Sequence, residues 1–193
     1  YLIYDQRRFS ALASDSLQLR EQRVFNVRDM MALDANAMHT IWSFIAANRP
    51  IIDVVQWTGA ASDLRHLHTS EFQPRVVRQR RWMTRVLDVR QALLQRGYGA
   101  KTFSLEFEFV DDLIEENCGR FTLQVTDGTA TISEDPGKQP IRMRVEDLPP
   151  LYSGLWSAEQ LQIAGRMTCD DAEQVSRLTT AFASSEPWMS DSF

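Results

Sequence analysis

The sequence predicts an α+β protein built from two units, and three observations support that prediction. Apolar residues alternate with polar ones over residues 103–109 and 121–125, as they do along half-buried antiparallel strands. Helical segments come before and after these strands rather than between them, which is typical of α+β folds. Charge is also divided, because residues 1–98 hold 14 Arg against nine Asp and Glu, whereas residues 99–193 hold seven Lys and Arg against 17.

These observations place a truncated α/β unit at residues 1–81 and an antiparallel sheet covered by helices at residues 82–193. The clearest element of the first unit is a helix capped by Asp34, in which apolar residues from Met38 to Ile45 recur at the spacing of one helical face. The other elements expected here are a strand end at 1–5, a loop at 9–16, strands at 17–27, 51–57 and 76–87, and a loop with one helical turn at 59–74.

In the second unit, capping residues mark the helices. Asp88 caps the first helix, and Ser157 with Gln160 forms a capping box for a later one. The dipeptide Asp127-Gly128 between two alternating segments indicates a hairpin. The expected elements are strands at Phe103–Val110, 120–125, 130–133 and 141–145, and helices near 89–96, 157–164 and 171–183, with Gly97 and Gly165 at helix ends.

Composition narrows the class of protein. With 44% hydrophobic residues the chain can bury a core, and no apolar run approaches the roughly 18 residues of a membrane-spanning helix. Two cysteines are too few for a disulfide framework, so we expect a reduced, cytoplasmic protein. Because the chain opens on Tyr1 in a strand-like run, we expect it to be part of a longer protein.

Several chemical motifs are considered and set aside. The run from Gly97 to Ala100 resembles an acyl-CoA pyrophosphate loop, but it follows a helix and precedes a strand, whereas such a loop leaves a strand and opens a helix. We therefore expect a helix end and turn there, and no CoA site in this chain. His66 and His68 have no matching cysteine or carboxylate cluster for a metal. No Gly-x-Ser-x-Gly segment accompanies the serines, which argues against a hydrolase.

Two further patterns allow more than one interpretation. Six arginines between Arg75 and Arg90 could contact nucleic acid, but only Trp82 offers a stacking ring among them and the whole chain is acidic. A solvated or interface face of a strand is the preferred interpretation, and no nucleic-acid partner is expected. The aromatic strands could line a lipid cavity, although an ordinary core is favoured. Glu106 and Glu108 on the opposite face are expected to be solvated.

The order of short segments in the second unit carries a family resemblance. It runs from Trp82-Met83-Thr84-Arg85 through the strands near 103, 119 and 141 to the chain end Pro187-Trp188-Met189-Ser190-Asp191-Ser192-Phe193. This order resembles the C-terminal part of the enhanced-intracellular-survival family of GNAT acetyltransferases. The resemblance implies a partial second GNAT-like domain at 1–81 and a sterol-carrier-like domain at 82–193, with a first acetyltransferase domain, which binds acetyl-CoA as co-substrate, outside this chain.

The resemblance also implies site residues and partners. Phe193 matches the family's terminal residue, whose carboxylate works in the active site; Asp191 and Trp188 would be its neighbours, and Trp82 and Asp88 would lie at the edge of the substrate pocket. The implied partners are a cationic amine and further copies of the protein, hexamers being the assembly of the family. Two hypotheses stand: the C-terminal portion of an N-acetyltransferase, or a non-catalytic sterol-carrier-like module that binds lipid. A plain oligomerisation fragment is a weaker third.

Overall fold

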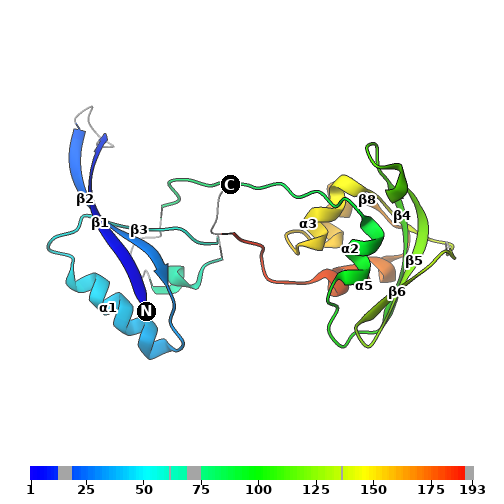
Figure 1. The fold of residues 1–193 in the computed structure, drawn as a ribbon, viewed down its shortest axis with the longest axis horizontal. Coiled ribbons are helices and arrows are strands. Elements are labelled where there is room, and N and C mark those ends of the chain that lie inside the picture. Colours follow the sequence, from blue (N-terminus) through cyan, green and yellow to red (C-terminus); the bar gives the residue numbers. More distant parts are fainter. Residues whose placement is uncertain (13–18, 61, 69–74, 136, 190–193) are drawn as a thin grey trace. The chain divides into compact units, whose positions relative to one another are not determined.

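The computed structural model describes residues 1–12, 19–60, 62–68, 75–135 and 137–189, and the chain forms two compact units, as Figure 1 shows. The first unit comprises Tyr1–Val76 and also takes in Trp188 and Met189. The second comprises Val77–Pro187. Each unit combines one sheet with helices, so the α+β fold class is confirmed.

The first unit contains a three-stranded sheet in the order β1 (Leu2–Leu12), β2 (Leu19–Met30), β3 (Val54–Trp57). β1 and β2 are antiparallel, whereas β2 and β3 are parallel. Parallel neighbours need a crossover connection, and α1 (Ala35–Ala47) supplies it. A short 3₁₀ turn, η1 (Leu64–His68), follows β3 and matches the helical turn expected there.

The helix predicted from Asp34 is confirmed. The Asp34 carboxylate accepts a hydrogen bond from the Ala37 backbone N–H at 2.7 Å, and Ile41 and Ile45 are buried in a cluster with Phe25. The strand predictions in this unit were less accurate. β1 continues through the start of the expected loop because residues 9–12 pair with β2, and β3 begins three residues later than expected because the chain first makes a turn after α1.

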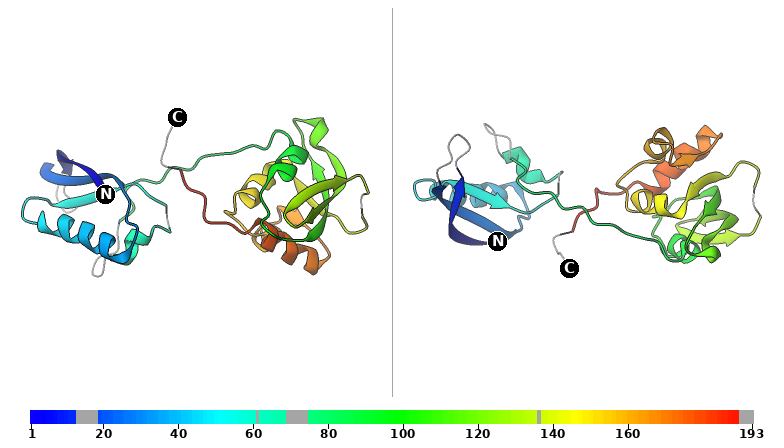
Figure 2. Two further views of the ribbon diagram at one scale, coloured as in Figure 1. Left: turned by 60° about the horizontal axis from the view of Figure 1, so that its bottom comes forward. Right: turned by 90° about the horizontal axis from the view of Figure 1, so that it is seen from above.

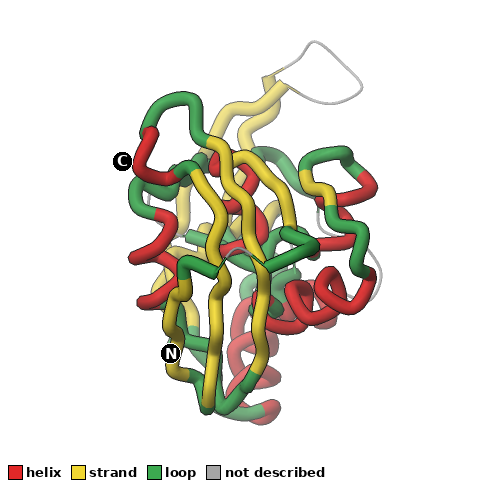
Figure 3. The backbone as a smooth tube through the Cα atoms, turned by 90° about the vertical axis from the view of Figure 1, so that its right-hand side faces the viewer, coloured by secondary structure: helices red, strands yellow, loops and turns green. Residues whose placement is uncertain are grey.

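The second unit contains a five-stranded sheet, seen face-on in Figure 3. Its order is β6-β5-β4-β7-β8. The strands are β4 (Phe103–Val110), β5 (Gly119–Thr126), β6 (Thr129–Ser133), β7 (Ile141–Arg144) and β8 (Met167–Thr168). The first four match predicted strands, whereas the two-residue β8 gave no signal in the sequence.

The sheet is not wholly antiparallel, as had been expected, because β4 and β7 are parallel. β6 ends level with Glu106 of β4, and β7 begins level with Phe107, so the chain crosses the sheet between them and continues in the same direction. Among the hydrogen bonds that hold the crossing, Thr122 Oγ1 donates to the Asp135 carbonyl at 2.6 Å, and the Gln139 N–H donates to Glu106 at 2.9 Å. Glu106 is therefore half-buried rather than solvated.

Helices cover one face of this sheet (Figures 1 and 2). They are α2 (Val89–Gln95), α3 (Leu148–Tyr152), α4 (Ala158–Ile163) and α5 (Ala172–Phe182), with 3₁₀ turns η2 (Glu115–Asn117) and η3 (Val145–Asp147) between strands. Leu105, Phe107 and Phe109 point into the core under the helices while Ser104 is exposed, which confirms the predicted register. The predicted capping box of Ser157 is present as well.

The strand expected at 76–87 is wrong. Residues 75–86 have no regular secondary structure, and Val76 and Val77 are 73% and 74% exposed. β-branched residues favour a strand only where a neighbouring strand supplies hydrogen bonds and packing, and none of the strands in the described ranges pairs with this segment. A second, smaller correction concerns the turn after α2, where the left-handed backbone (φ +61°) belongs to Gly99 and not to Gly97.

Candidate functional site

The most informative part of the second unit is the point where α5 ends and the C-terminal segment (residues 183–193) begins. α5 stops at Phe182, and Ala183 (φ −56°, ψ 125°) turns the chain out of the helix. The described part of the segment, residues 183–189, has no regular secondary structure. Its direction therefore depends on what holds its first residues.

Two basic side chains bind the last turn of α5. The final carbonyls of a helix have no partner within the helix and carry partial negative charge. Lys101 Nζ donates to the Thr180 carbonyl at 2.6 Å, and Arg96 Nη2 donates to the Phe182 carbonyl at 3.2 Å. Both bonds join the end of α5 to the loop between α2 and β4.

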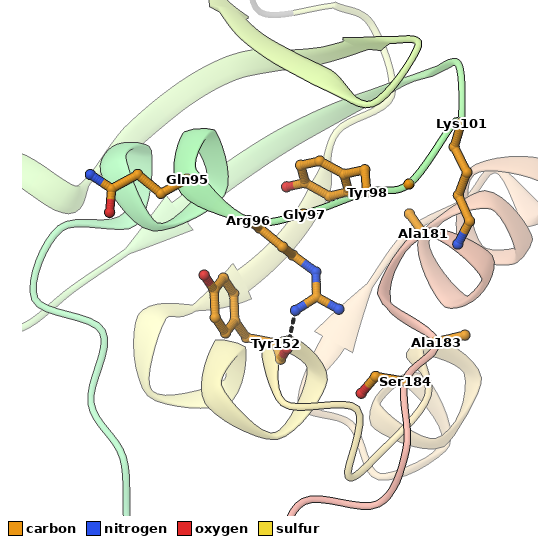
Figure 4. A pocket seen from close by; sticks show the side chains of 10 residues that line it. Gln95, Arg96, Gly97, Tyr98, Lys101, Tyr152, Ala181, Ala183 and Ser184 are labelled. Carbon is orange, nitrogen blue, oxygen red and sulfur yellow. Dashed lines mark hydrogen bonds between the residues drawn. The ribbon is translucent and has the colours of Figure 1, made fainter.

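Arg96 also bonds the end of a second helix. Its Nη1 donates to the carbonyl of Tyr152, the last residue of α3, as Figure 4 shows. Its guanidinium carbon lies 5.0 Å from the centre of the Tyr152 ring and 4.7 Å from the centre of the Phe182 ring, within the range of cation–π attraction. One side chain thus fixes the ends of α3 and α5 to each other.

A third contact holds the first residues of the segment itself. Ser184 Oγ donates to the Ser153 carbonyl at 2.9 Å. Beside it Gly154 has a left-handed backbone (φ +77°), and a Cβ added there would lie 2.0 Å from Ser184 Oγ. Glycine is needed at this position both for its backbone angle and for the approach of the C-terminal segment.

A surface pocket of about 570 Å³ lies at this junction (Figure 4). Arg96, Tyr98, Lys101, Tyr152 and Ser184 contribute its side chains together with Gln95 and small residues. The two cations are already bonded to helix carbonyls, and the lining contains no carboxylate. The pocket therefore lacks a negatively charged side chain that would attract a cationic amine.

Of the predicted site residues that the structure describes, none lines this pocket. Trp82 is 47% exposed on the irregular segment before α2. Asp88 is the N-cap of α2, and its carboxylate accepts the Gln91 N–H at 2.9 Å. Trp188 is 47% exposed, so only part of its ring is buried. Asp191 and Phe193 lie outside the described residues.

Other chemistry considered from the sequence finds no support in geometry. The residues from Gly97 to Ala100 form the turn between α2 and β4, in the order helix, loop, strand. No group of three or more His, Cys, Asp and Glu suited to a metal ion occurs within the described ranges. His66 and His68 instead lie beside the rings of Trp57 and Trp42, with ring centres 5.9 and 6.2 Å apart. None of the described helices has the length and apolarity to cross a membrane.

The sequence analysis missed Arg96, Tyr152 and Ser184. A signal existed for Arg96, because it follows the last residue of α2, and basic residues at helix ends commonly bind helix carbonyls. The carbonyls that it binds belong to helices 56 and 86 residues further along the chain, however. That pairing has no signature in the local sequence.

Comparisons with known proteins agree with this architecture. Residues 1–90 match the acetyltransferase (GNAT) domain family, and residues 89–190 match the sterol carrier protein domain family. The chain belongs to the Eis-type family of GNAT acetyltransferases. It is 28% identical to the N-acetyltransferase Eis of Mycobacterium tuberculosis in an alignment of 191 positions that covers 95% of this chain and 46% of that protein. An uncharacterized N-acetyltransferase of Streptomyces griseus is 29% identical over 87% of this chain and 41% of its own length.

A solved structure extends the comparison. A GCN5-related N-acetyltransferase from Anabaena variabilis superimposes with a TM-score of 0.81 at 30% identity, over 98% of this chain and 46% of that one. This Eis-type chain thus spans about half the length of the relatives that it matches. The compact units divide after Val76 and the family matches near residue 89, so the domain boundary at 81 stays a prediction.

Proposed function

We propose that this chain is the C-terminal portion of an Eis-like N-acetyltransferase that transfers an acetyl group from acetyl-CoA to a cationic amine. In this proposal the sterol-carrier-like unit delivers the chain's own C-terminal carboxylate, that of Phe193, to the active site. Trp188 and Asp191 flank the terminus, and Trp82 and Asp88 lie at the edge of the pocket for the amine.

The observation that carries the proposal is the anchored start of the C-terminal segment. Arg96 and Lys101 bond the last turn of α5 and Ser184 bonds the Ser153 carbonyl, whereas residues 183–189 form no regular element. Chain ends that lack such anchoring are usually mobile. An irregular segment with a defined starting direction is suited to placing its end group at a distant site.

The chemistry requires a neutral amine, so a cationic acceptor must lose a proton before it attacks the acetyl group. A carboxylate beside the amine attracts the cation, orients it and accepts the proton directly or through water. An α-carboxyl group has an ordinary pKa of about 3.3–3.7, which makes it a weak base unless burial raises that pKa. Electrostatic positioning is therefore its main contribution.

Acetyl-CoA is assigned to another part of the protein. The loop from Gly97 to Ala100 follows a helix and lacks the strand-to-helix order that a pyrophosphate loop needs. The relatives are about twice as long as this chain. In this proposal, an acetyltransferase domain in the remaining part of the protein binds acetyl-CoA and packs with this chain. Calorimetric titration of this chain with acetyl-CoA should give no measurable heat of binding, and micromolar binding would contradict the assignment.

The proposal also includes a cytoplasmic location and a hexameric assembly. Cys118 and Cys169 are free thiols, which suits the reducing cytoplasm. The full-length protein is proposed to form the hexamer of its family, and sedimentation analysis would test this directly. A monomer at micromolar concentration would remove the assembly from the proposal.

The competing function is lipid binding by the sterol-carrier-like unit. The tightly packed core of that unit argues against lipid binding. Phe107, Phe109 and Phe121 are at most 1% exposed, and their ring centres are 5.3–5.9 Å apart. A cavity large enough for a lipid would leave part of these rings accessible. A fluorescent fatty acid should therefore fail to bind the chain at micromolar concentration.

The decisive experiment changes the terminus of the full-length protein. Adding two glycines after Phe193 moves the α-carboxylate by about 7 Å, since each extended residue adds about 3.3–3.6 Å. We expect kcat/KM for a polyamine or an aminoglycoside to fall by about 10- to 100-fold with folding intact, the cost of a misplaced catalytic group. A matched insertion of two glycines between Arg49 and Pro50, in the exposed turn after α1, serves as the control. An unchanged kcat/KM after the terminal extension would remove Phe193 from the mechanism.

A further inference from the structure

We propose that Arg96 is a positioning residue for acetyl transfer, because it sets the direction in which the C-terminal segment leaves the sterol-carrier-like unit. The inference rests on the proposed role of the C-terminal carboxylate. It adds the side chain that orients the segment carrying this carboxylate. Arg96 itself is not placed in contact with the substrate.

The first step of the argument is the geometry of Arg96. Its guanidinium lies between the rings of Tyr152 and Phe182 and donates to the carbonyls of the same two residues. Its Nε is buried and has no hydrogen-bond partner among the described residues. A buried donor without a partner is costly, so the two carbonyls and two rings must hold the group firmly.

The second step is the position of the residues that Arg96 holds. Phe182 is the last residue of α5, and Ala183 begins the C-terminal segment. Tyr152 is followed at once by Ser153 and Gly154, which contact Ser184. Arg96 therefore bonds Phe182, the residue before the C-terminal segment. It also bonds Tyr152, at the end of α3, next to the Ser153 carbonyl that accepts the hydrogen bond from Ser184.

The third step is the effect of Arg96 on the path of the C-terminal segment. Residues 183–189 follow directly from the residues that Arg96 holds, so a change of backbone angle at this base redirects the segment that leads to the chain end. A shift of about 1 Å at a reacting group can lower a rate by about 100-fold. Loss of Arg96 should thus affect catalysis as well as stability, because Phe182, whose ring it covers, belongs to the buried core.

The chain contains a matched control for this arginine. Arg90 also lies over an aromatic ring, with its guanidinium carbon 4.6 Å from the Phe121 ring centre, and it forms an ion pair with Glu134. It belongs to the same helix region but contacts neither α3, α5 nor the C-terminal segment in any described interaction. Arg90→Met therefore removes a comparable set of interactions without loosening the base of the segment.

The test is a double-mutant cycle in the full-length enzyme, which combines Arg96→Met with the two-glycine extension after Phe193. We expect Arg96→Met to lower kcat by about tenfold with the native terminus and to change it less than twofold in the extended protein, because both changes misplace one group. Arg90→Met should leave kcat unchanged. Hydrogen exchange should be faster in residues 183–189 of Arg96→Met alone, with protection in β4 and β5 retained.

The outcomes separate the two proposals. If the extension lowers kcat while Arg96→Met changes neither kcat nor exchange in residues 183–189, Arg96 has no positioning role and the terminal carboxylate keeps its own. If both changes lower kcat and their effects multiply, Arg96 acts by another route. If the extension has no effect, the proposed function itself fails.

Two milder variants keep the test usable if Arg96→Met does not fold. Arg96→Lys keeps the charge but cannot reach both carbonyls with a planar fork, and it should recover part of the lost kcat. Ser184→Ala removes the independent bond to Ser153 and should lower kcat in the same non-additive way with the extension. Wild-type kcat in both variants would overturn the inference.

Discussion

Replacing Gly154 with alanine should destabilise the second unit by about 2–4 kcal/mol, well beyond the cost of the backbone angle alone. Gly154 follows the C-cap of α3 with φ +77°, a region that costs an L-residue about 1–2 kcal/mol. The new Cβ would lie 2.0 Å from Ser184 Oγ, 3.1 Å from its Cβ and 3.3 Å from its backbone nitrogen. Moving Ser184 away forfeits its bond to Ser153, worth about 1 kcal/mol, and shifts backbone as well.

Gly165 is the matched control. It holds the equivalent position after α4 with φ +69°, and a Cβ there would meet nothing within 4 Å. Gly165→Ala should therefore cost only about 1–2 kcal/mol. The difference between the two substitutions isolates the steric contact with the C-terminal segment.

The assay is urea unfolding of each variant, followed by circular dichroism and by tryptophan fluorescence, with the free energy taken from the midpoint and slope. A third protein, Gly154→Ala with Ser184→Gly, removes the obstructing side chain. It should recover about 1 kcal/mol or more of the loss, measured as a coupling energy. Equal destabilisation by Gly154→Ala and Gly165→Ala, with no coupling to Ser184, would show that the segment is not seated against Gly154.

Two further predictions concern single carboxylates. The side chain of Asp111 is 1% exposed. Burial would raise its pKa, but hydrogen bonds from Asn117 and two backbone N–H groups and the ion pair with Arg85 lower the pKa to about 2. Because the folded pKa lies below the ordinary value of about 3.9, its contribution to stability is complete above that value and is lost as pH falls through about 2. Asp111→Asn should therefore flatten the decline of unfolding free energy between pH 5 and pH 2.5, and an unchanged slope would contradict this. Asp88→Ala should cost about 1 kcal/mol through loss of the helix cap, whereas Asp88→Ser should keep the cap. If Asp88 also binds the amine in the full-length enzyme, Asp88→Ser should raise KM at unchanged stability. An unchanged KM would show that Asp88 acts only as the helix cap.

Local patterns were sufficient for most of the regular elements. Asp34, Asp88 and Ser157 cap helices as predicted, since a cap depends on a side chain and a backbone N–H two or three residues away. The alternation in β4 identified its buried face, and Asp127 with Gly128 identified the hairpin, because each of these depends on neighbours within a few residues. The two-unit α+β class and the family followed from the order of such segments.

Pairing between distant segments was decided only by the tertiary structure. Residues 75–86 have strand-like composition but no partner strand, and β7 lies parallel to β4 because of where the chain crosses the sheet. In the sequence, Arg96 is an arginine after a helix with no further distinguishing feature. Its role depends on α3 and α5, whose packing places the carbonyls of Tyr152 and Phe182 beside it. A hydrogen bond or ring contact between residues 56 or 86 positions apart leaves no periodic trace in the sequence, so the base of the C-terminal segment emerges only when the helices pack.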